Sequence, residues 1–211
     1  MSDTFHRSPP RSARKAKGEG HVRRGEILKV AERLFAEQGY EGATIRKIAE
    51  EVGLSSTALY MHFSDKSEIL YELCRSAFEQ LIAATGAIMQ QDLPVDEKLR
   101  QILAAYGNFA LANPNAYRLV YLTRPLEAEH GAQSAAQDLG GDLFRDFLSL
   151  VYEIEAQGRL KTPPAVAAQV LWAGVHGVVS LIITKPYFNW AGSSELIDTM
   201  IDSLKAGLIR A

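Results

Sequence analysis

The sequence has only one cysteine, Cys74, among its 211 residues, so no disulfide can form within the chain. It also has no apolar run of about twenty residues, the length that a membrane-spanning helix requires. The most apolar stretch, VLWAGVHGVVSLIIT from Val170 to Thr184, is shorter and carries a histidine near its middle. We therefore expect a buried helix at this position and a protein that does not associate with a membrane.

Apolar residues are almost missing from the first twenty positions, which are rich in Ser, Pro, Gly, Arg and Lys. Such a segment has too little to bury to join a core, so residues 1–20 are predicted to be a disordered basic arm. The basic residues of this arm are not followed by the apolar segment of a secretory signal. Together with the single cysteine, this favours a protein of the reducing cytoplasm.

The alternation of apolar and polar residues that is typical of half-buried strands is also missing, and no segment is repeated. Helical spacing occurs instead, because Ile27, Val30, Ala31, Leu34 and Phe35 follow one another at the intervals of one helix face. We therefore predict an all-α chain. Its helices are expected at about 27–39, 45–52, 56–62, 66–90, 95–112, 115–122, 128–157, 164–184 and 194–209.

Charge is distributed unevenly along the chain. The part up to Lys66 holds twelve Lys and Arg against nine Asp and Glu, whereas the rest holds eleven against sixteen. The front of the chain is therefore basic and the back acidic. We predict an N-terminal three-helix helix-turn-helix domain at 21–66, after the arm, and a C-terminal helical bundle for ligand binding and dimerisation at 67–211.

Two short helices are predicted close together, separated by a turn at Gly53. Thr44 and Ser55 can each cap the start of one of them, and the D-x-x-E pattern from Asp65 to Glu68 can start the long helix that follows. Two short helices joined by a tight turn have the geometry of a helix-turn-helix, whose second helix fits the DNA major groove. The exposed side chains of that second helix would be Ser55, Ser56, Thr57, Tyr60 and Met61.

The stretch TIRKIAEEVGLSSTALYMHFSDKSEIL, from Thr44 to Leu70, resembles the DNA-binding region of the TetR family of transcriptional regulators. The resemblance covers about residues 22–70 and implies that this region contacts DNA. Phosphate contacts are implied for Thr44, Tyr60, His62 and Lys66, and contacts to bases or phosphates for Arg46, Ser56 and Thr57. The matching residues are Gly39, Tyr40, Gly42, Thr44, Ile48, Ala49, Gly53, Leu59, Tyr60, His62, Phe63 and Lys66.

These residue types also suit DNA binding on physical grounds. Hydroxyl groups donate to phosphates or base edges, and Thr57 can touch a thymine methyl group. Arg46, Lys47 and Lys66 add positive charge, which displaces counterions from DNA. Blander interpretations stay open, because His62 could be a packed histidine and the cations ordinary solvated charges. The arm could likewise enter a minor groove or remain a solvated tail.

A single helix-turn-helix buries too little surface for tight specific binding, so a second half-site roughly 34–36 Å away and a two-fold dimer are expected. The last two helices can supply the interface, because 166–184 is apolar on nearly all sides and 194–209 carries an apolar stripe. We expect a homodimer on a palindromic operator in double-stranded DNA. The stripe consists of Leu196, Ile197, Met200, Ile201, Leu204 and Leu208.

The segments ANPNAYRLVY and LWAGVHGVVSL resemble a C-terminal subtype of TetR-like regulators that is marked by Trp-x-x-x-His-Gly. The middle helices are rich in aromatic residues, which suit a lipophilic small-molecule effector when a few polar groups anchor it. Tyr106, Arg118 and His176 are the expected anchors, although aromatics at helical spacing can equally be core. The predicted ligand-binding residues are Tyr106, Phe109, Arg118, Tyr121, Phe144, Phe147, Trp172 and His176.

These patterns predict a homodimeric repressor that a small lipophilic ligand releases from its operator. An all-helical enzyme is the first alternative, but Glu127-x-x-His130 is the only Glu-x-x-His fragment of the di-iron type. No catalytic residue, metal site or cofactor is therefore expected. A protein that coats DNA is the second alternative, and it would bind random duplex as tightly as a palindrome.

Overall fold

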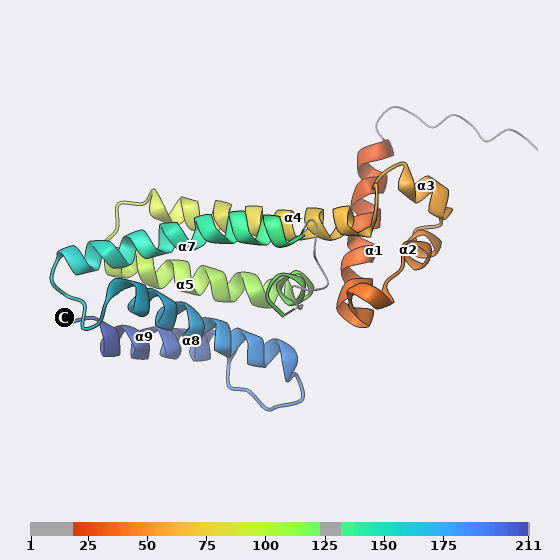
Figure 1. The fold of residues 1–211 in the computed structure, drawn as a ribbon. Coiled ribbons are helices and arrows are strands. Elements are labelled where there is room, and N and C mark those ends of the chain that lie inside the picture. The colour runs from red at the N-terminus through yellow and green to blue at the C-terminus, as the bar shows by residue number, and fades with distance from the viewer. Residues whose placement is uncertain (1–18, 123–131, 211) are drawn as a thin grey trace, which may run out of the picture.

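The computed structural model describes residues 19–122 and 132–210, and over these ranges it confirms the all-α prediction. Figure 1 shows a small group of helices at one end of an elongated bundle. The only β-type pairing in the described ranges is an isolated bridge between Leu160 and Ile209. The elements are α1 Glu19–Gly42, α2 Ile45–Glu51, α3 Ser56–Tyr60, α4 Lys66–Met89, α5 Val95–Ala112, α6 Pro114–Tyr117, the π-helical turn η1 Arg118–Leu122, α7 Ala132–Ala156, α8 Pro164–Thr184 and α9 Ser193–Leu208.

Helix α1 is longer than predicted, because it begins at Glu19 rather than near Ile27. The first eighteen residues of the predicted arm lie outside the described ranges. The predicted break at Gly39 is confirmed, since φ there is 73°, a backbone conformation that glycine adopts without steric cost. A last short turn then leads to Gly42 and into α2.

The helix starts of the first domain are capped as predicted. The Thr44 hydroxyl accepts a hydrogen bond from the Lys47 N–H (3.3 Å), and the Ser55 hydroxyl accepts one from the Ala58 N–H (3.1 Å). Asp65 caps α4 in the same way. Because these bonds satisfy free N–H groups at the helix ends, α2 and α3 can be short and still be well defined. The core beneath them contains Ile27, Leu34, Phe35, Ile48, Leu59 and Phe63.

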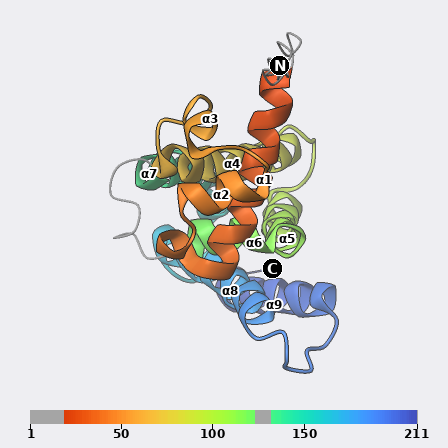
Figure 2. The same ribbon diagram turned by 90° about the vertical axis from the view of Figure 1, so that its right-hand side faces the viewer.

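Helix α4 belongs to both parts of the molecule. Its residues Ile69, Leu70 and Cys74 are buried in the core of the first domain, whereas Leu81 is buried in the core of the bundle. Figure 2 views the molecule from the helix-turn-helix end, with α1 and α2 in front of the bundle. Helix α4 therefore contributes to the core of the first domain up to Cys74 and to the core of the bundle further along.

The bundle is formed by α4, α5, α7, α8 and α9, with α4 packed on α7 and α8 packed on α9. Glycines set two close approaches. A Cβ at position 107 would lie 2.9 Å from Ile197 Cδ1, and a Cβ at position 174 would overlap Leu204 Cδ1. A larger residue at Gly174 would therefore require the Leu204 side chain of α9 to move.

The single helix predicted at 115–122 is wrong in its second half. Helix α6 ends at Tyr117, and the next five residues form the π-helical turn η1. This rare geometry is often found at functional sites. Tyr117 is buried in the bundle core, whereas Leu119 is buried in the first domain. Position 128, where α7 was predicted to start, lies outside the described ranges. The described part of α7 begins at Ala132.

By length and composition, α8 is the one helix in the described ranges that could cross a membrane. Its inner face, with Leu171, Val175 and Val179, is buried against α5, α7 and α9, as predicted for this apolar stretch. Its outer face carries Val166, Val170 and Leu181, which are exposed in the single chain. An exposed apolar stripe of this kind often marks an interaction surface.

Candidate DNA-binding surface and ligand cavity

The outer surface of α3 carries the side chains predicted to meet DNA. Ser55 and Thr57 are exposed, Ser56 is half-buried, and Tyr60 has 53% of its surface exposed. Met61, which follows the helix, is 84% exposed. A tyrosine and a methionine exposed to this extent contribute little to folding, so their placement favours contact with a partner. We call Ser55, Ser56, Thr57, Tyr60 and Met61 the recognition surface.

Thr44 and Arg46 lie at the start of α2. The Thr44 hydroxyl caps the helix and the residue is exposed, so its oxygen also remains within reach of a partner. The Arg46 side chain is exposed and pairs with Glu50 (2.8 Å). An exposed pair of this kind contributes little to stability, so Arg46 can exchange the carboxylate for a phosphate at small cost. The predicted roles of both residues in DNA binding are compatible with this geometry.

Lys66 bonds to the protein through its side chain, whereas His62 does so through its backbone carbonyl and keeps a half-buried side chain. The Lys66 ammonium donates to the Tyr40 carbonyl (2.8 Å) and lies 4.0 Å from the centroid of the Tyr40 ring. The carbonyl of His62 accepts a hydrogen bond from Arg24. Because an ammonium has three donors, Lys66 can hold Tyr40 and still bind a phosphate. The phosphate contact of Lys66 stays a prediction. Its bond to Tyr40 is a structural role that was not predicted from the sequence.

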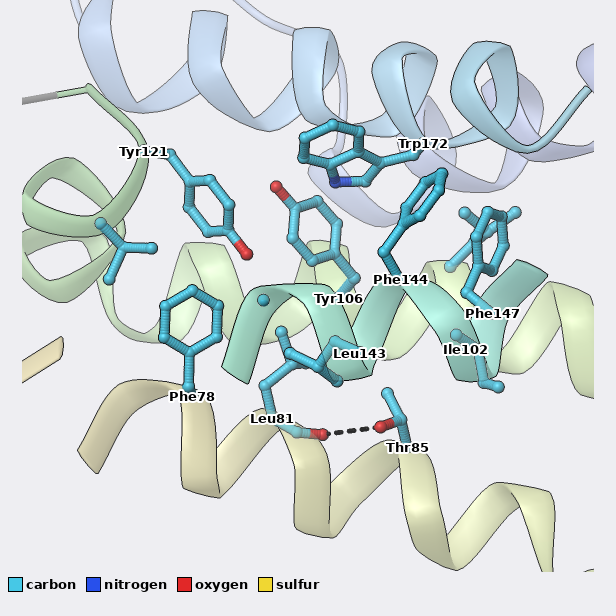
Figure 3. A pocket seen from close by; sticks show the side chains of 13 residues that line it. Phe78, Leu81, Thr85, Ile102, Tyr106, Tyr121, Leu143, Phe144, Phe147 and Trp172 are labelled. Atoms are coloured by element: carbon cyan, nitrogen blue, oxygen red, sulfur yellow. Dashed lines mark hydrogen bonds between the residues drawn. The ribbon is translucent and has the colours of Figure 1, made fainter. Parts of the chain in front are cut away.

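A cavity of about 320 Å³ that is partly open to solvent lies in the bundle and is lined by side chains from α4, α5, η1, α7 and α8 (Figure 3). This volume is at the lower end of the usual range for small-molecule sites. Five of the eight predicted ligand-binding residues line it: Tyr106, Tyr121, Phe144, Phe147 and Trp172. The remaining lining residues are Phe78, Leu81, Thr85, Ile102, Leu103, Val120, Gly140 and Leu143.

The other three predicted residues are not part of the cavity wall. Phe109 packs at the edge of the bundle core, and the Arg118 guanidinium donates to the Ile183 carbonyl (2.7 Å). The His176 ring lies behind the wall, with Nδ1 at 2.8 Å from the hydroxyls of both Tyr106 and Tyr117. Two of the three expected polar anchors, Arg118 and His176, would therefore act through other residues.

The contribution of α4 to the cavity was not predicted from the sequence. Phe78, Leu81 and Thr85 lie on one face of that helix, at helical spacing. This spacing is visible in the sequence, but it does not distinguish a cavity wall from an ordinary core. The Thr85 hydroxyl donates to the Leu81 carbonyl (3.0 Å), so its polar group is largely satisfied within the helix.

Burial keeps the groups around the cavity uncharged. It raises the pKa of Tyr117 to about 12 and also raises the pKa values of Tyr106 and Tyr121. It lowers the pKa of His176, because the charged imidazolium is disfavoured away from water. At neutral pH this part of the bundle therefore holds three phenols and a neutral imidazole.

A helix-turn-helix with an exposed second helix, joined through α4 to a bundle with an apolar cavity, is the architecture of a DNA-binding regulator with a separate helical domain. Comparison with known families agrees with this class. Residues 27–73 match "Bacterial regulatory proteins, tetR family" and residues 99–204 match "Tetracyclin repressor-like, C-terminal domain". The chain belongs to the TetR family of regulators, which confirms the resemblance of residues 22–70 to that family and excludes the enzyme alternative, whereas the resemblance to the Trp-x-x-x-His-Gly subtype stays a prediction.

Known relatives are similar to this chain over different parts of its length. BepR, a transcriptional repressor of Brucella suis, is 28% identical over 92% of this chain and 97% of its own length. The repressor AcnR of Corynebacterium diphtheriae is 44% identical over 32% of this chain, and the activator FasR of Mycolicibacterium smegmatis is 29% identical over 49%. The matched segments span only 37% of AcnR and 49% of FasR.

A solved structure supports the same fold. The ketosteroid transcriptional regulator KstR2 of Mycobacterium tuberculosis superposes with a TM-score of 0.71, over 90% of this chain and 96% of its own, at 20% identity. At this level of identity, the likeness concerns the fold alone.

Proposed function

We propose that the protein is a homodimeric, sequence-specific repressor that a small lipophilic ligand releases from a palindromic operator. One observation carries the proposal: the turn η1 packs Leu119 into the core of the helix-turn-helix domain and presents Tyr121 to the cavity. A ligand that moves Tyr121 therefore acts on a segment that also packs against the DNA-binding domain. A cytoplasmic location follows from this function, because the operator lies there.

The recognition surface supports binding of α3 in the major groove. Ser56 and Thr57 would contact bases or phosphates, and the Tyr60 hydroxyl would reach the sugar-phosphate backbone. Around this helix, Arg46 and Lys66 would neutralise phosphates. Thr44, Ser55 and His62 complete the proposed DNA-binding set.

The exposed stripe of α8 supports the homodimer. Val166, Val170 and Leu181 point away from the chain's own core, and a second copy related by a two-fold axis would cover them. The predicted contribution of the α9 stripe is wrong, because Ile197 and Ile201 are buried in the bundle core of the same chain and Leu204 and Leu208 pack against that core. A dimer formed in this way would hold two copies of α3 for two half-sites of a palindrome.

Further contacts join the α6–η1 segment to its surroundings. Burial raises the pKa of Glu32 on α1, and a hydrogen bond from the Ala116 N–H of α6 partly offsets this effect. Arg118 bonds to the carbonyl of Ile183, near the end of α8. The α6–η1 segment therefore contacts the first domain, the cavity and α8, the helix of the proposed dimer interface. Helix α4 is a second connection between the two domains, because its side chains are buried in the cores of both.

Release then requires only that the ligand bind one arrangement of the dimer more tightly than the other. In the arrangement that the ligand favours, the two copies of α3 would be at a separation that does not match the operator. Repression rather than activation is supported by BepR, which matches nearly the whole chain and is a repressor.

The proposal is tested by selecting bound duplexes from a random pool, followed by a salt titration of the best sequence. We expect a two-fold symmetric sequence bound about a thousandfold or more tightly than random DNA. Equal binding of random duplex, with the same salt dependence, would contradict sequence-specific regulation and favour a protein that coats DNA.

The substitution Leu119→Ala tests the connection through η1. It removes a buried side chain that joins the turn to the first domain, so we expect an inducing ligand to lose roughly threefold to thirtyfold of its effect on operator affinity. Operator binding is measured with and without a ligand that releases the wild-type protein, and thermal unfolding verifies that the variant is folded.

The matched control for this experiment is Leu122→Ala, because Leu122 belongs to the same turn but is exposed. It should leave the ligand response unchanged. If Leu119→Ala is folded and responds to ligand like the wild type, η1 does not transmit the signal.

A further inference from the structure

The cavity wall has very few polar groups. Among the described residues that line it, none carries a charge, and the polar side-chain groups are the hydroxyls of Tyr106, Tyr121 and Thr85 and the indole N–H of Trp172. The Thr85 hydroxyl is already bonded to a backbone carbonyl (Figure 3). Hydrogen bonding to a ligand is therefore concentrated at the end of the cavity where Tyr106, Tyr121 and Trp172 meet.

Figure 3 shows the Tyr106 hydroxyl beside the Trp172 ring, and the Tyr121 hydroxyl pointing into the space between Tyr106 and Phe78. The three rings are in contact, since the Tyr121 centroid lies 5.8 Å from that of Tyr106 and 6.4 Å from that of Trp172. This arrangement forms one polar end on a cavity that is otherwise hydrocarbon and aromatic.

We propose that the cavity binds an uncharged, mainly hydrocarbon ligand with one hydrogen-bonding group held by Tyr106, and that it excludes carboxylates and ammonium ions. This proposal deepens the proposed function and rests on its assignment of the cavity as the effector site. Carboxylates and ammonium ions are excluded from the cavity because of the cost of desolvating their charge. A charged group held at the polar end, beside the buried Tyr106, loses most of its water and gains no countercharge from the described wall.

His176 makes Tyr106 adaptable to either kind of hydrogen-bonding group. A neutral imidazole has one N–H, and its Nδ1 can either accept a hydrogen bond from Tyr106 or donate one to it. When Nδ1 accepts, the Tyr106 oxygen, which also receives the Trp172 N–H, has a second lone pair that can accept from a ligand hydroxyl. When Nδ1 donates, the Tyr106 O–H is left to donate to a ligand carbonyl. His176 is therefore a positioning residue rather than a ligand contact.

Tyr117 provides the matched control for Tyr106. Its hydroxyl lies at the same distance, 2.8 Å, from His176 Nδ1, but it has a second acceptor in the His176 carbonyl (3.3 Å). Tyr117 is fully buried and is not among the residues that line the cavity. Loss of its hydroxyl perturbs the same histidine without removing a group from the wall.

The test uses two matched probe series, one linear and one fused-ring: decanol, methyl decanoate and decanoate, and naphthol, methyl naphthoate and naphthoate. Decylammonium is added as the cation. Binding to the full chain is measured by calorimetry without DNA. For the linear series, Trp172 fluorescence is a second readout in a Trp190→Phe background, which leaves Trp172 as the only tryptophan.

We expect the alcohol and the ester of at least one series to bind, and the charged members to bind about tenfold or more weakly. In Tyr106→Phe, affinity for the alcohol and the ester should fall about threefold to tenfold, the value of one hydrogen bond. In Tyr117→Phe it should change less than about twofold.

Binding of decanoate or naphthoate as tight as that of the neutral partners would overturn the proposal, and so would the absence of binding by every neutral probe. Equal losses in the two tyrosine variants would overturn the role of Tyr106. Because DNA is absent, these results are separate from the proposed function. A neutral probe that binds as described but does not release the operator would contradict ligand-controlled repression and leave the ligand class intact.

Discussion

Replacing Tyr60 with alanine is expected to lower affinity for the selected operator by roughly a hundredfold, because the dimer loses one contact in each half-site. Tyr60 is suited to this test because no hydrogen bond within the described chain uses its hydroxyl and about half of its surface is exposed. Lys66→Ala is a less clean test, since it also removes the bond to the Tyr40 carbonyl. The measurement is an operator titration at fixed salt, together with helical content and molecular mass.

Tyr152→Ala is the matched control. Tyr152 lies on α7, in the bundle, and is 50% exposed, close to the exposure of Tyr60. The control should bind the operator like the wild type. An unchanged affinity in Tyr60→Ala would remove Tyr60 from the proposed DNA-binding set, and an equal loss in both variants would point to a general effect of removing a tyrosine.

A charge placed on the outer face of α8 should separate the subunits. Leu181 is 48% exposed in the single chain, so Leu181→Glu is expected to leave the fold of each subunit intact. In the proposed dimer the carboxylate would be buried without a partner at both copies, which costs several kcal/mol. We expect the mass in solution to change from dimer to monomer, and operator affinity to fall by about a hundredfold or more.

Sedimentation and operator binding check this prediction, with Tyr152→Glu as a control that places the same charge on a similarly exposed site of α7. The control should stay dimeric and bind DNA. A Leu181→Glu protein that remains a dimer would show that this face of α8 is not the interface, and the exposed stripe would need another explanation.

The helix-turn-helix domain was predictable from the sequence because its signals act over a few residues. Thr44, Ser55 and Asp65 cap the helices that follow them, and Gly39 and Gly53 adopt the positive φ values that their turns require. Each of these features depends on neighbours within about four positions in the chain. The periodic apolar residues of α1 then determine which face is buried.

The cavity was only partly predictable, because its wall comes from segments far apart in the sequence. Aromatic residues at helical spacing identified Tyr106, Phe144 and Trp172, but the same pattern selected Phe109, which packs elsewhere. The placement of His176 behind Tyr106 depends on how α8 lies against α5, and no local pattern contains that information.

By itself, the sequence determined the all-α class, the caps and turns of the DNA-binding domain and the family to which the chain belongs. The tertiary structure alone decided which aromatics enclose a cavity, that α4 contributes to it, and that η1 connects Tyr121 to the first domain through Leu119. The physical reason is the range of the interactions. Capping and periodicity are local and leave a readable pattern, whereas a cavity remains only where five packed segments leave space between them.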